Sequence, residues 1–202
     1  MPKIFTEEKR HIIRKQLRTA GLELFGRYGL FHTTVDMLVN ACMIAKGSFY
    51  SFYPSKEMLY LDCLETISDR IGREYTLPLL SDASTPDISL RNLLEATISL
   101  PGTFPILEDL HTPRTKAALQ AVIGQSGHSK QSLSVGHDWA VITRYWQERG
   151  YSLDIIPGRL HAMEQALLLL AVHGEFARVR EGVELIIEMV AIGSAGFVSY
   201  RQ

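Results

Sequence analysis

Residues 33–59 read TTVDMLVNACMIAKGSFYSFYPSKEML, and helix signals are closely spaced in this stretch. Thr33 and Asp36 have the spacing of a capping box, which indicates that a helix begins beside them. Apolar residues then recur at helical spacing, at Val35, Leu38 and Val39. We therefore expect a short helix at the start of this stretch.

A second short helix follows after a tight turn. The helical pattern resumes at Ala45 and runs to Tyr53, where Pro54 forbids further helix because it lacks an amide donor and clashes with the preceding turn. Ser55 can cap the next helix. Residues 34–53 thus predict two short helices around a turn, an arrangement that can place its second helix in the major groove of DNA.

Longer amphipathic helices flank this pair. Thr6 can cap a helix over residues 7–28, and Gly29 can take the left-handed conformation that ends it. A further helix is expected over residues 55–75. In both, apolar residues recur at steps of 4, 3, 4 and 4: Ile13, Leu17, Ala20, Leu24 and Tyr28 in the first, and Tyr60, Leu64, Ile67, Ile71 and Tyr75 in the second.

The rest of the chain is also predicted to be helical. Residues 76–89 contain two prolines with Ser, Asp and Thr, which indicates a connection. Helices are expected at 89–100, 103–111, 114–123, 131–149, 157–175 and 180–199, and no alternating pattern argues for a sheet. The sequence therefore predicts an all-α fold of three parts: an N-terminal three-helix part (1–53), a connecting helix (54–75) and a C-terminal helical part (76–202).

Composition narrows the class of protein. Hydrophobic residues make up 46% of the 202 residues and charged residues 21%, which is typical of a globular chain rather than a disordered one. Residues 1–60 carry nine Lys or Arg and five acids, whereas the remainder carries 12 basic and 17 acidic residues. A basic head on an acidic body is compatible with a polyanion-binding module, although solvated surfaces often show such an excess by chance.

Targeting and redox signals are weak in this sequence. The first residues are charged and lack the apolar core of a secretory signal, and the longest apolar run, residues 166–172, is too short to cross a membrane. Cys42 and Cys63 lie within apolar helical patterns, where free buried thiols are expected. These features predict a cytoplasmic protein in a reducing compartment.

The stretch quoted first resembles the helix-turn-helix of the tetracycline-repressor (TetR) family. A Thr-capped helix is followed by a turn, by Lys46-Gly47-Ser48-Phe49-Tyr50, and then by Ser55-Lys56-Glu57 at the start of the next helix. The resemblance covers residues 6 to about 75. It implies a DNA-binding transcriptional regulator, more often a repressor than an activator, with a DNA-binding domain at residues 1–53 and a regulatory and dimerisation domain at residues 76–202. It further implies a homodimer that binds a near-palindromic operator and responds to a small-molecule effector without a cofactor.

The residues expected to contact DNA lie around the second short helix. Lys46 and Ser48 offer donors to phosphates or base edges, Gly47 lets the backbone approach DNA, and the hydroxyl of Tyr50 can reach a phosphate. Phe49 is expected in the core. The full set of predicted DNA-contacting residues is Thr33, Thr34, Ala45, Lys46, Gly47, Ser48, Tyr50 and Lys56.

Three residues depart from the pattern of the family. Met43 stands where a turn glycine is usual, at an expected cost of roughly 1 kcal/mol. Ala45 replaces a common serine and so loses one polar contact. Phe52 stands where Tyr or His often bonds a phosphate, and phenylalanine cannot make that bond.

The C-terminal helices carry more apolar surface than one core-facing side needs. We predict a homodimer through a four-helix bundle of residues 157–198, with an interface formed by Leu160, Met163, Leu167, Ala171, Val183, Ile186, Val190 and Phe197. Two ordinary buried helices in a monomer are the alternative. The resemblance also implies an effector site, for which the candidate residues are Phe104, Leu107, His111, Asp138, Trp139 and Trp146.

Other classes of function have less support. The sequence has no nucleophile motif, phosphate-binding loop or closed set of metal ligands, so neither an enzyme nor a metal site is predicted. A helical metal-binding bundle or enzyme using His111, His161 and Glu164 stays an alternative, because His161 and Glu164 share a helix face. A module that binds only other proteins is a third possibility.

Overall fold

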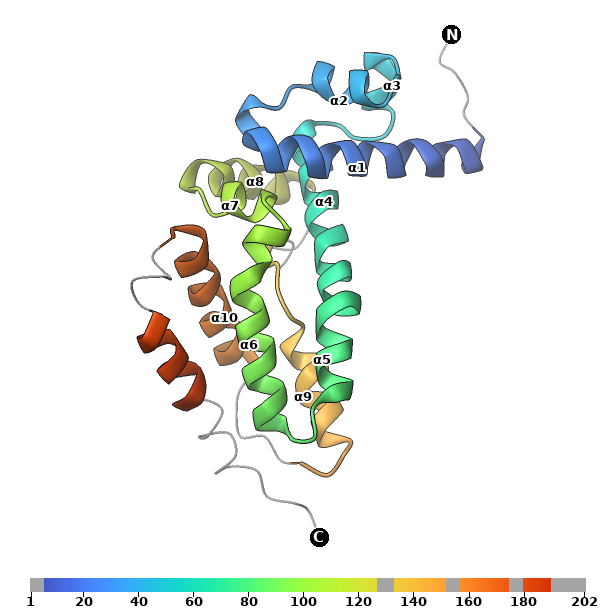
Figure 1. The fold of residues 1–202 in the computed structure, drawn as a ribbon. Helices are drawn as coiled ribbons and strands as arrows, with labels where there is room; N and C mark the ends of the chain where they lie inside the picture. The colour runs from blue at the N-terminus through green and yellow to red at the C-terminus, as the bar shows by residue number, and fades with distance from the viewer. Residues whose placement is uncertain (1–5, 127–132, 152–156, 175–179, 190–202) are drawn as a thin grey trace. The chain divides into compact units, whose positions relative to one another are not determined.

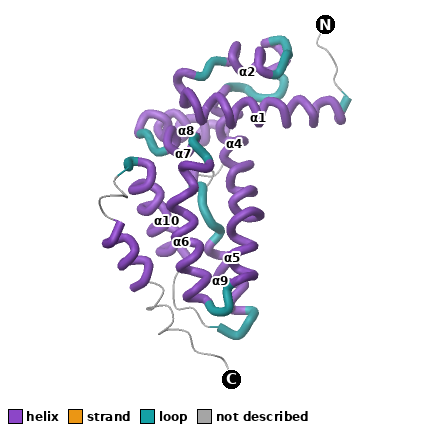
Figure 2. Tube along the Cα trace, viewed as in Figure 1, coloured by secondary structure: helices purple, strands orange, loops and turns teal. Residues whose placement is uncertain are grey.

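A computed structural model describes residues 6–126, 133–151, 157–174 and 180–189. The chain divides into two compact units. Unit 1 comprises residues 1–66 and 104–134, and unit 2 comprises residues 67–103 and 135–202. In the described ranges both units consist of helices and loops, without a strand, as Figure 2 shows. The predicted all-α fold is confirmed.

Unit 1 contains the N-terminal helices together with two helices from the middle of the chain. In the order of the chain these are α1 (Glu7–His32), α2 (Val35–Ala41), α3 (Lys46–Tyr50), the first part of α4 (Lys56–Ile71), α7 (Ile106–Leu110) and α8 (Pro113–Ser126). α2 packs against α1 and α3, and α7 packs against α1 (Figure 1). Residues 104–134 thus group with the N-terminal helices, although the sequence was expected to place them in a separate regulatory domain.

The ends of α1 follow from its sequence. The hydroxyl of Thr6 accepts a hydrogen bond from the Lys9 N–H at 3.3 Å, so Thr6 caps α1 as predicted. Gly29 has a φ of +72°, which breaks the helical geometry near the C-terminal end. Of the predicted inward residues, Ile13, Leu17 and Ala20 are buried and Leu24 is half-buried, whereas Tyr28 is 40% exposed. The periodicity is therefore confirmed for most of the helix but is wrong for Tyr28 at its end.

The core of unit 1 is built from large apolar and aromatic side chains. Phe25 and Tyr60 lie with their ring centroids 4.9 Å apart. Gly21 allows α1 to approach α4 closely, because a Cβ at this position would lie 2.8 Å from the sulfur of Cys63. Cys42 and Cys63 are both buried and free, as predicted, and burial raises the pKa of each thiol.

Unit 2 begins within α4. A π-helical turn, η1 (Gly72–Thr76), follows α4 and leads into α5 (Leu77–Asp82), α6 (Pro86–Thr103), α9 (Trp139–Gln147), α10 (Pro157–Val172) and a helix at residues 180–189. α6 packs against α10, and α10 packs against α9. The core of this unit lies between these helices.

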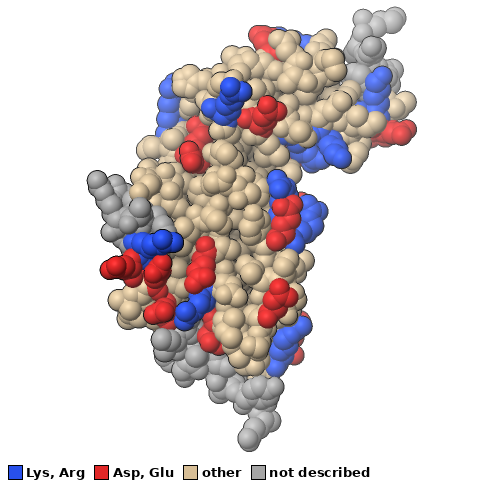
Figure 3. Space-filling model, in the orientation of Figure 1, with Lys and Arg blue, Asp and Glu red and all other residues tan. Residues whose placement is uncertain are grey.

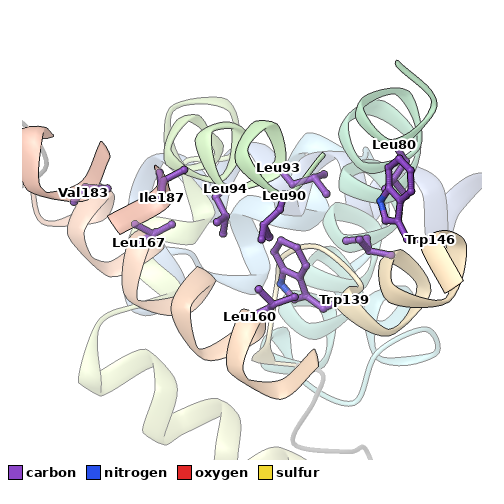
Figure 4. Packing of buried hydrophobic residues seen from close by; sticks show 11 residues of the cluster. Leu80, Leu90, Leu93, Leu94, Trp139, Trp146, Leu160, Leu167, Val183 and Ile187 are labelled. Atoms are coloured by element: carbon purple, nitrogen blue, oxygen red, sulfur yellow. The ribbon is translucent and has the colours of Figure 1, made fainter. Parts of the chain in front are cut away.

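Figure 4 shows how the side chains of this core meet. Leu94, Leu167 and Ile187 point toward one another from three helices, and Leu160 lies against the indole of Trp139. The two tryptophans of the chain, Trp139 and Trp146, are each 3% exposed. Unit 2 therefore has a hydrophobic core of its own.

Several boundaries differ from the sequence predictions. Residues 77–82, predicted as a connection, form α5, since Pro78 occupies the first turn of a helix, where a missing amide donor costs little. Pro101 was expected to end a helix but lies within α6, two residues before its last residue, Thr103. The helix predicted from residue 131 begins at Trp139, after a cap by Asp138. Residues 190–199 of the last predicted helix lie outside the described residues.

None of the described helices is both long enough and apolar enough to cross a bilayer.

Candidate nucleic-acid interface

The two short helices predicted from residues 34–53 are present as α2 and α3. The hydroxyl of Thr34, not Thr33, caps α2 by accepting a hydrogen bond from the Met37 N–H at 3.2 Å. α3 begins after Ala45, which makes no side-chain cap bond. This agrees with the prediction that alanine at this position loses a polar contact that serine would make. Ser55 caps the start of α4 through the Met58 N–H. The pair is thus fixed at both ends by local hydrogen bonds.

Met43 occupies the turn between α2 and α3 in a left-handed conformation. Its φ is +52°, and among the described residues it is the one non-glycine residue with a positive φ. The side chain is 92% exposed, so packing does not compensate the backbone strain. The prediction that Met43 accepts the backbone of the usual glycine is confirmed. It borders a groove of about 690 Å³ between α1 and the turn, lined in part by Ile12, Ile13 and Ile44.

The outward residues of α3 are exposed or half-buried. Lys46 is exposed, and Tyr50 is 51% exposed. A Cβ added at Gly47 would meet nothing within 4 Å, so the absence of a side chain there is not required by packing within the chain. Ser48 is half-buried. We call Lys46, Gly47, Ser48 and Tyr50 the α3 surface.

Lys46 is held in this structure by an acid from α2. Its Nζ lies 2.9 Å from Oδ2 of Asp36, and both side chains are more than half exposed. A hydrogen bond from Lys46 to Asp36 and the attraction between the two charges raise the pKa of Lys46, so the ammonium is charged at neutral pH. Exposed pairs of this kind contribute little to stability. Lys46 can therefore exchange Asp36 for another anion at little cost.

Two predicted DNA-contacting residues point elsewhere. Thr33 is fully buried, and its hydroxyl donates to the carbonyls of Leu24 and Gly29 at 3.1 and 2.8 Å. The prediction that Thr33 contacts DNA is therefore wrong, because its side chain closes the end of α1. Lys56 donates to the carbonyls of Leu30 and Thr33 at 2.6 and 2.8 Å. This placement gives the ammonium a structural role within unit 1.

Aromatic residues anchor α3 from its inner side. Phe49 is fully buried, as expected, and Phe52 is 8% exposed with the guanidinium of Arg10 over its ring. The hydroxyl of Tyr53 donates to Asp62 on α4, and burial, followed by this contact, raises the pKa of Tyr53. The inner side of α3 is thus fixed, and the α3 surface faces away from the core.

On one face of the molecule (Figure 3), charged side chains are spread out rather than gathered in one stripe. On the face drawn in Figure 3, acidic and basic side chains are interspersed among uncharged residues. The basic excess of residues 1–60 therefore does not form one continuous band on this face.

The six residues predicted to line an effector site belong to two different units. Phe104, Leu107 and His111 are buried in unit 1, where Nδ1 of His111 lies 2.7 Å from the Leu107 carbonyl. Trp139 and Trp146 are buried in unit 2. Asp138 is exposed and caps α9 by accepting from the N–H groups of Ala140 and Val141. Within its own unit, each of these side chains is either buried or caps a helix.

A buried polar network in unit 2 was not predicted from the sequence. Glu164 is fully buried and accepts hydrogen bonds from the backbone N–H of His137 at 2.7 Å and from the indole N–H of Trp139 at 2.8 Å. Nε2 of His137 lies 3.1 Å from the Leu93 carbonyl, and Nδ1 lies 2.7 Å from the hydroxyl of Thr76. Burial lowers the pKa of His137. Spacing along one helix relates Glu164 only to His161. It therefore does not reveal the contacts of Glu164 with His137 and Trp139, which lie elsewhere in the chain.

His161 and Glu164 do form the predicted pair. Nδ1 of His161 lies 3.7 Å from a carboxylate oxygen of Glu164, which raises the pKa of His161. His111, the third residue of the alternative metal site, belongs to unit 1. In the part of the chain that the structure describes, no three His, Cys, Asp or Glu residues are grouped as a metal site would need.

The predicted dimer stripe is partly internal. Leu160, Leu167 and Val183 are buried in the core of unit 2, which corrects their assignment to a surface shared with a second copy. Met163 and Ala171 are half-buried, and Ile186 is 50% exposed. Val190 and Phe197 lie outside the described residues. The large apolar residues that are exposed on these helices are Leu169, Leu185, Ile186 and Met189.

Comparison with known proteins bears on the N-terminal helices. Residues 17–63 match the family described as bacterial regulatory proteins, tetR family. The chain is 39% identical over 56 residues to the uncharacterized HTH-type transcriptional regulator YuxN of Bacillus subtilis, which is 28% of this chain and 19% of that protein. It is 41% identical over 63 residues to the HTH-type transcriptional dual regulator CecR of Shigella flexneri, which is 31% of this chain and 27% of that protein. The matched stretch thus spans about a fifth to a quarter of these relatives.

Solved structures resemble the chain over most of its length. The crystal structure of RolR in complex with resorcinol has a TM-score of 0.58 at 13% identity, covering 92% of this chain and 88% of that chain. A TetR-family transcriptional regulator from Haemophilus influenzae has a TM-score of 0.55 at 17% identity, covering 96% and 99%. At these identities the likeness concerns the fold.

Proposed function

We propose, from the premise that residues 17–63 form a tetR-family helix-turn-helix region, that this chain is a ligand-responsive transcriptional regulator that reads DNA through α3. The observation that carries the proposal is the α3 surface. Three of its four residues are exposed, and Ser48 is half-buried, on a helix whose inner side is fixed by Phe49. Its first turn carries the donors that meet phosphates and base edges in helix-turn-helix proteins. The curated relatives of this region are named as transcriptional regulators.

Each residue of the interface has a distinct proposed role. Lys46 exchanges its ion pair with Asp36 for a phosphate or a guanine edge, and Ser48 supplies a second donor. Tyr50 reaches the phosphate backbone, while Gly47 leaves room for the backbone of α3 to approach. Thr34 and Ala45 lie at the exposed starts of α2 and α3, where free N–H groups can contact phosphates.

We further propose that the chain acts as a homodimer on a near-palindromic operator. The apolar side chains that remain exposed on α10 and on the helix at residues 180–189 support this proposal: Leu169 at 37%, Leu185 at 56%, Ile186 at 50% and Met189 at 64%. Several large apolar side chains left exposed are typical of an interface with a second copy. A two-fold dimer would present two α3 helices to successive major grooves.

A small apolar or aromatic effector is proposed to bind within unit 2. Three buried donors there lack a partner among the described residues, the indole N–H of Trp146 and the hydroxyls of Thr85 and Ser89. An unsatisfied buried polar group costs about 1–3 kcal/mol, so a ligand with an acceptor would be favoured at any one of them. The fold of a protein solved with resorcinol bound supports the size class of such an effector. Binding of the effector is proposed to lower the affinity of the chain for its operator, so that the chain acts as a repressor that the effector releases from DNA.

Selection of DNA fragments bound from a genomic library tests this function. The wild-type chain is expected to enrich a near-palindromic sequence, and Lys46→Gln is expected to lose that enrichment while staying folded. An effector found by its release of this DNA is expected to change the fluorescence of Trp139 and Trp146, the only tryptophans in the sequence. Recovery of random fragments by the wild-type chain would contradict the assignment.

A further inference from the structure

The corner between α1 and α2 requires hydrogen-bond partners from outside these two helices. Gly29 leaves the helical geometry at a φ of +72°, and Leu30, the next residue, is fully buried. The Leu30 N–H is therefore shielded from water at the point where the helical hydrogen-bond pattern is broken. A buried N–H without an acceptor would be costly, so another element has to supply one.

Asp109 of α7 supplies that acceptor. Its Oδ2 accepts from the Leu30 N–H at 2.9 Å and from the hydroxyl of Tyr60 at 3.1 Å, and its Oδ1 accepts from the hydroxyl of Thr115 at 3.2 Å. The carboxylate also lies against Gly29, because a Cβ on this glycine would be 2.5 Å from Oδ1. One side chain thus joins the end of α1 to α4, α7 and α8.

This corner sets the direction in which α2 begins. The carbonyls of Leu30 and Thr33 accept hydrogen bonds from Lys56, and Thr34 immediately caps α2. α2 packs against α3 in turn. The position of the α3 surface therefore depends on contacts that begin at Asp109, which lies 46 residues beyond the end of the matched region at residue 63.

The negative charge of Asp109 makes it possible to distinguish its structural effect on DNA binding from its electrostatic effect. A carboxylate within a unit that binds a polyanion opposes binding through its charge, so any gain in DNA affinity from Asp109 has to come from the positions it fixes. Removal of one negative charge elsewhere on α7 is expected to have the opposite effect. Glu108, its exposed neighbour on the same helix, offers that comparison.

We infer that Asp109 is a positioning residue for DNA recognition: through Gly29 and Leu30 it fixes the start of α2, and thereby makes operator affinity depend on α7. This inference rests on the proposed function and adds a determinant outside the helix-turn-helix. Asparagine at this position offers one acceptor oxygen in place of two, so at least one of the three donors loses its partner while the size of the side chain is kept.

The test compares Asp109→Asn with Glu108→Gln in the full-length protein, using the operator selected by the wild-type chain and a scrambled duplex. Asp109→Asn is expected to lower operator affinity about tenfold, the size of a single mismatched base pair, with affinity for the scrambled duplex unchanged or higher. Glu108→Gln is expected to keep or raise both affinities. Hydrogen exchange at the Leu30 amide should accelerate in the first variant and stay unchanged in the second.

Equal operator affinities per folded molecule for the two variants would overturn the inference, because a purely structural role lowers stability without changing the affinity of the folded protein. If Asp109→Asn does not fold, Thr115→Val removes one donor to the same carboxylate and decides the question by a smaller loss in the same direction. Failure of the wild-type chain to select any DNA would overturn the proposed function and this inference together. Selection by the wild type with no difference between the variants would overturn this inference alone.

Discussion

Replacement of Met43 by glycine is expected to stabilise the protein by about 0.5–1 kcal/mol. A residue with a Cβ costs about 1–2 kcal/mol in the left-handed region, and glycine costs about 0.4–1 kcal/mol through the greater freedom of the unfolded chain. Met43 has a φ of +52° and is 92% exposed. Because burial of a whole methionine side chain contributes about 1.5–3 kcal/mol, its small buried fraction contributes on the order of 0.2 kcal/mol. The relief of strain therefore exceeds both losses.

Met43→Ala is the matched control for this prediction. Alanine retains the Cβ that causes the strain but removes the rest of the side chain, so the alanine variant is expected to stay within about 0.5 kcal/mol of the wild type. Urea denaturation followed by circular dichroism measures all three proteins. A glycine variant no more stable than the alanine variant would refute the reasoning that the turn is strained by its Cβ.

Three further substitutions test other parts of the structure. Thr34→Ala removes the cap of α2 and is expected to cost about 1 kcal/mol of stability, measured by denaturation. Lys56→Met removes two charged hydrogen bonds to carbonyls of the α1–α2 corner and is expected to cost about 1–3 kcal/mol in the same assay; no loss would contradict its structural role. His161→Asn tests the pair with Glu164. Since the pKa of His161 is raised in the folded state above its ordinary value of 6.5, the stabilisation is complete below pH 6.5 and lost as pH rises through the raised pKa. The variant should lack this loss, and identical pH profiles of stability would contradict the pairing.

Local features of the structure could be predicted from the sequence. Thr6, Gly29 and Ser55 act at the helix ends where their residue types place them, and Met43 adopts the strained turn that its position implies. These features depend on residues within four positions of one another. The spacing of side chains along the chain is sufficient to identify them.

Features that depend on distant residues could not be predicted. The bond between Leu30 and Asp109 joins residues 79 positions apart, and the bond between Trp139 and Glu164 joins different helices. Periodicity finds an apolar face but does not tell whether it meets the chain's own core or a second copy. Leu167 and Ile186 were for this reason assigned to one interface, although the first is 4% exposed and the second 50%. A proline signal is similarly incomplete, since Pro101 removes one backbone bond near the end of α6 without ending the helix.

The most direct test of DNA recognition through α3 is the ratio of affinities for the selected operator and a scrambled duplex, measured over a range of salt concentrations for the wild type and Lys46→Gln. We expect the wild type to prefer the operator by about a thousandfold or more at physiological salt. We expect Lys46→Gln to reduce both this preference and the salt dependence, by about one phosphate contact if the ammonium binds the backbone. Equal affinity of the wild type for both duplexes, or an unchanged ratio and salt dependence in a folded Lys46→Gln variant, would contradict the account.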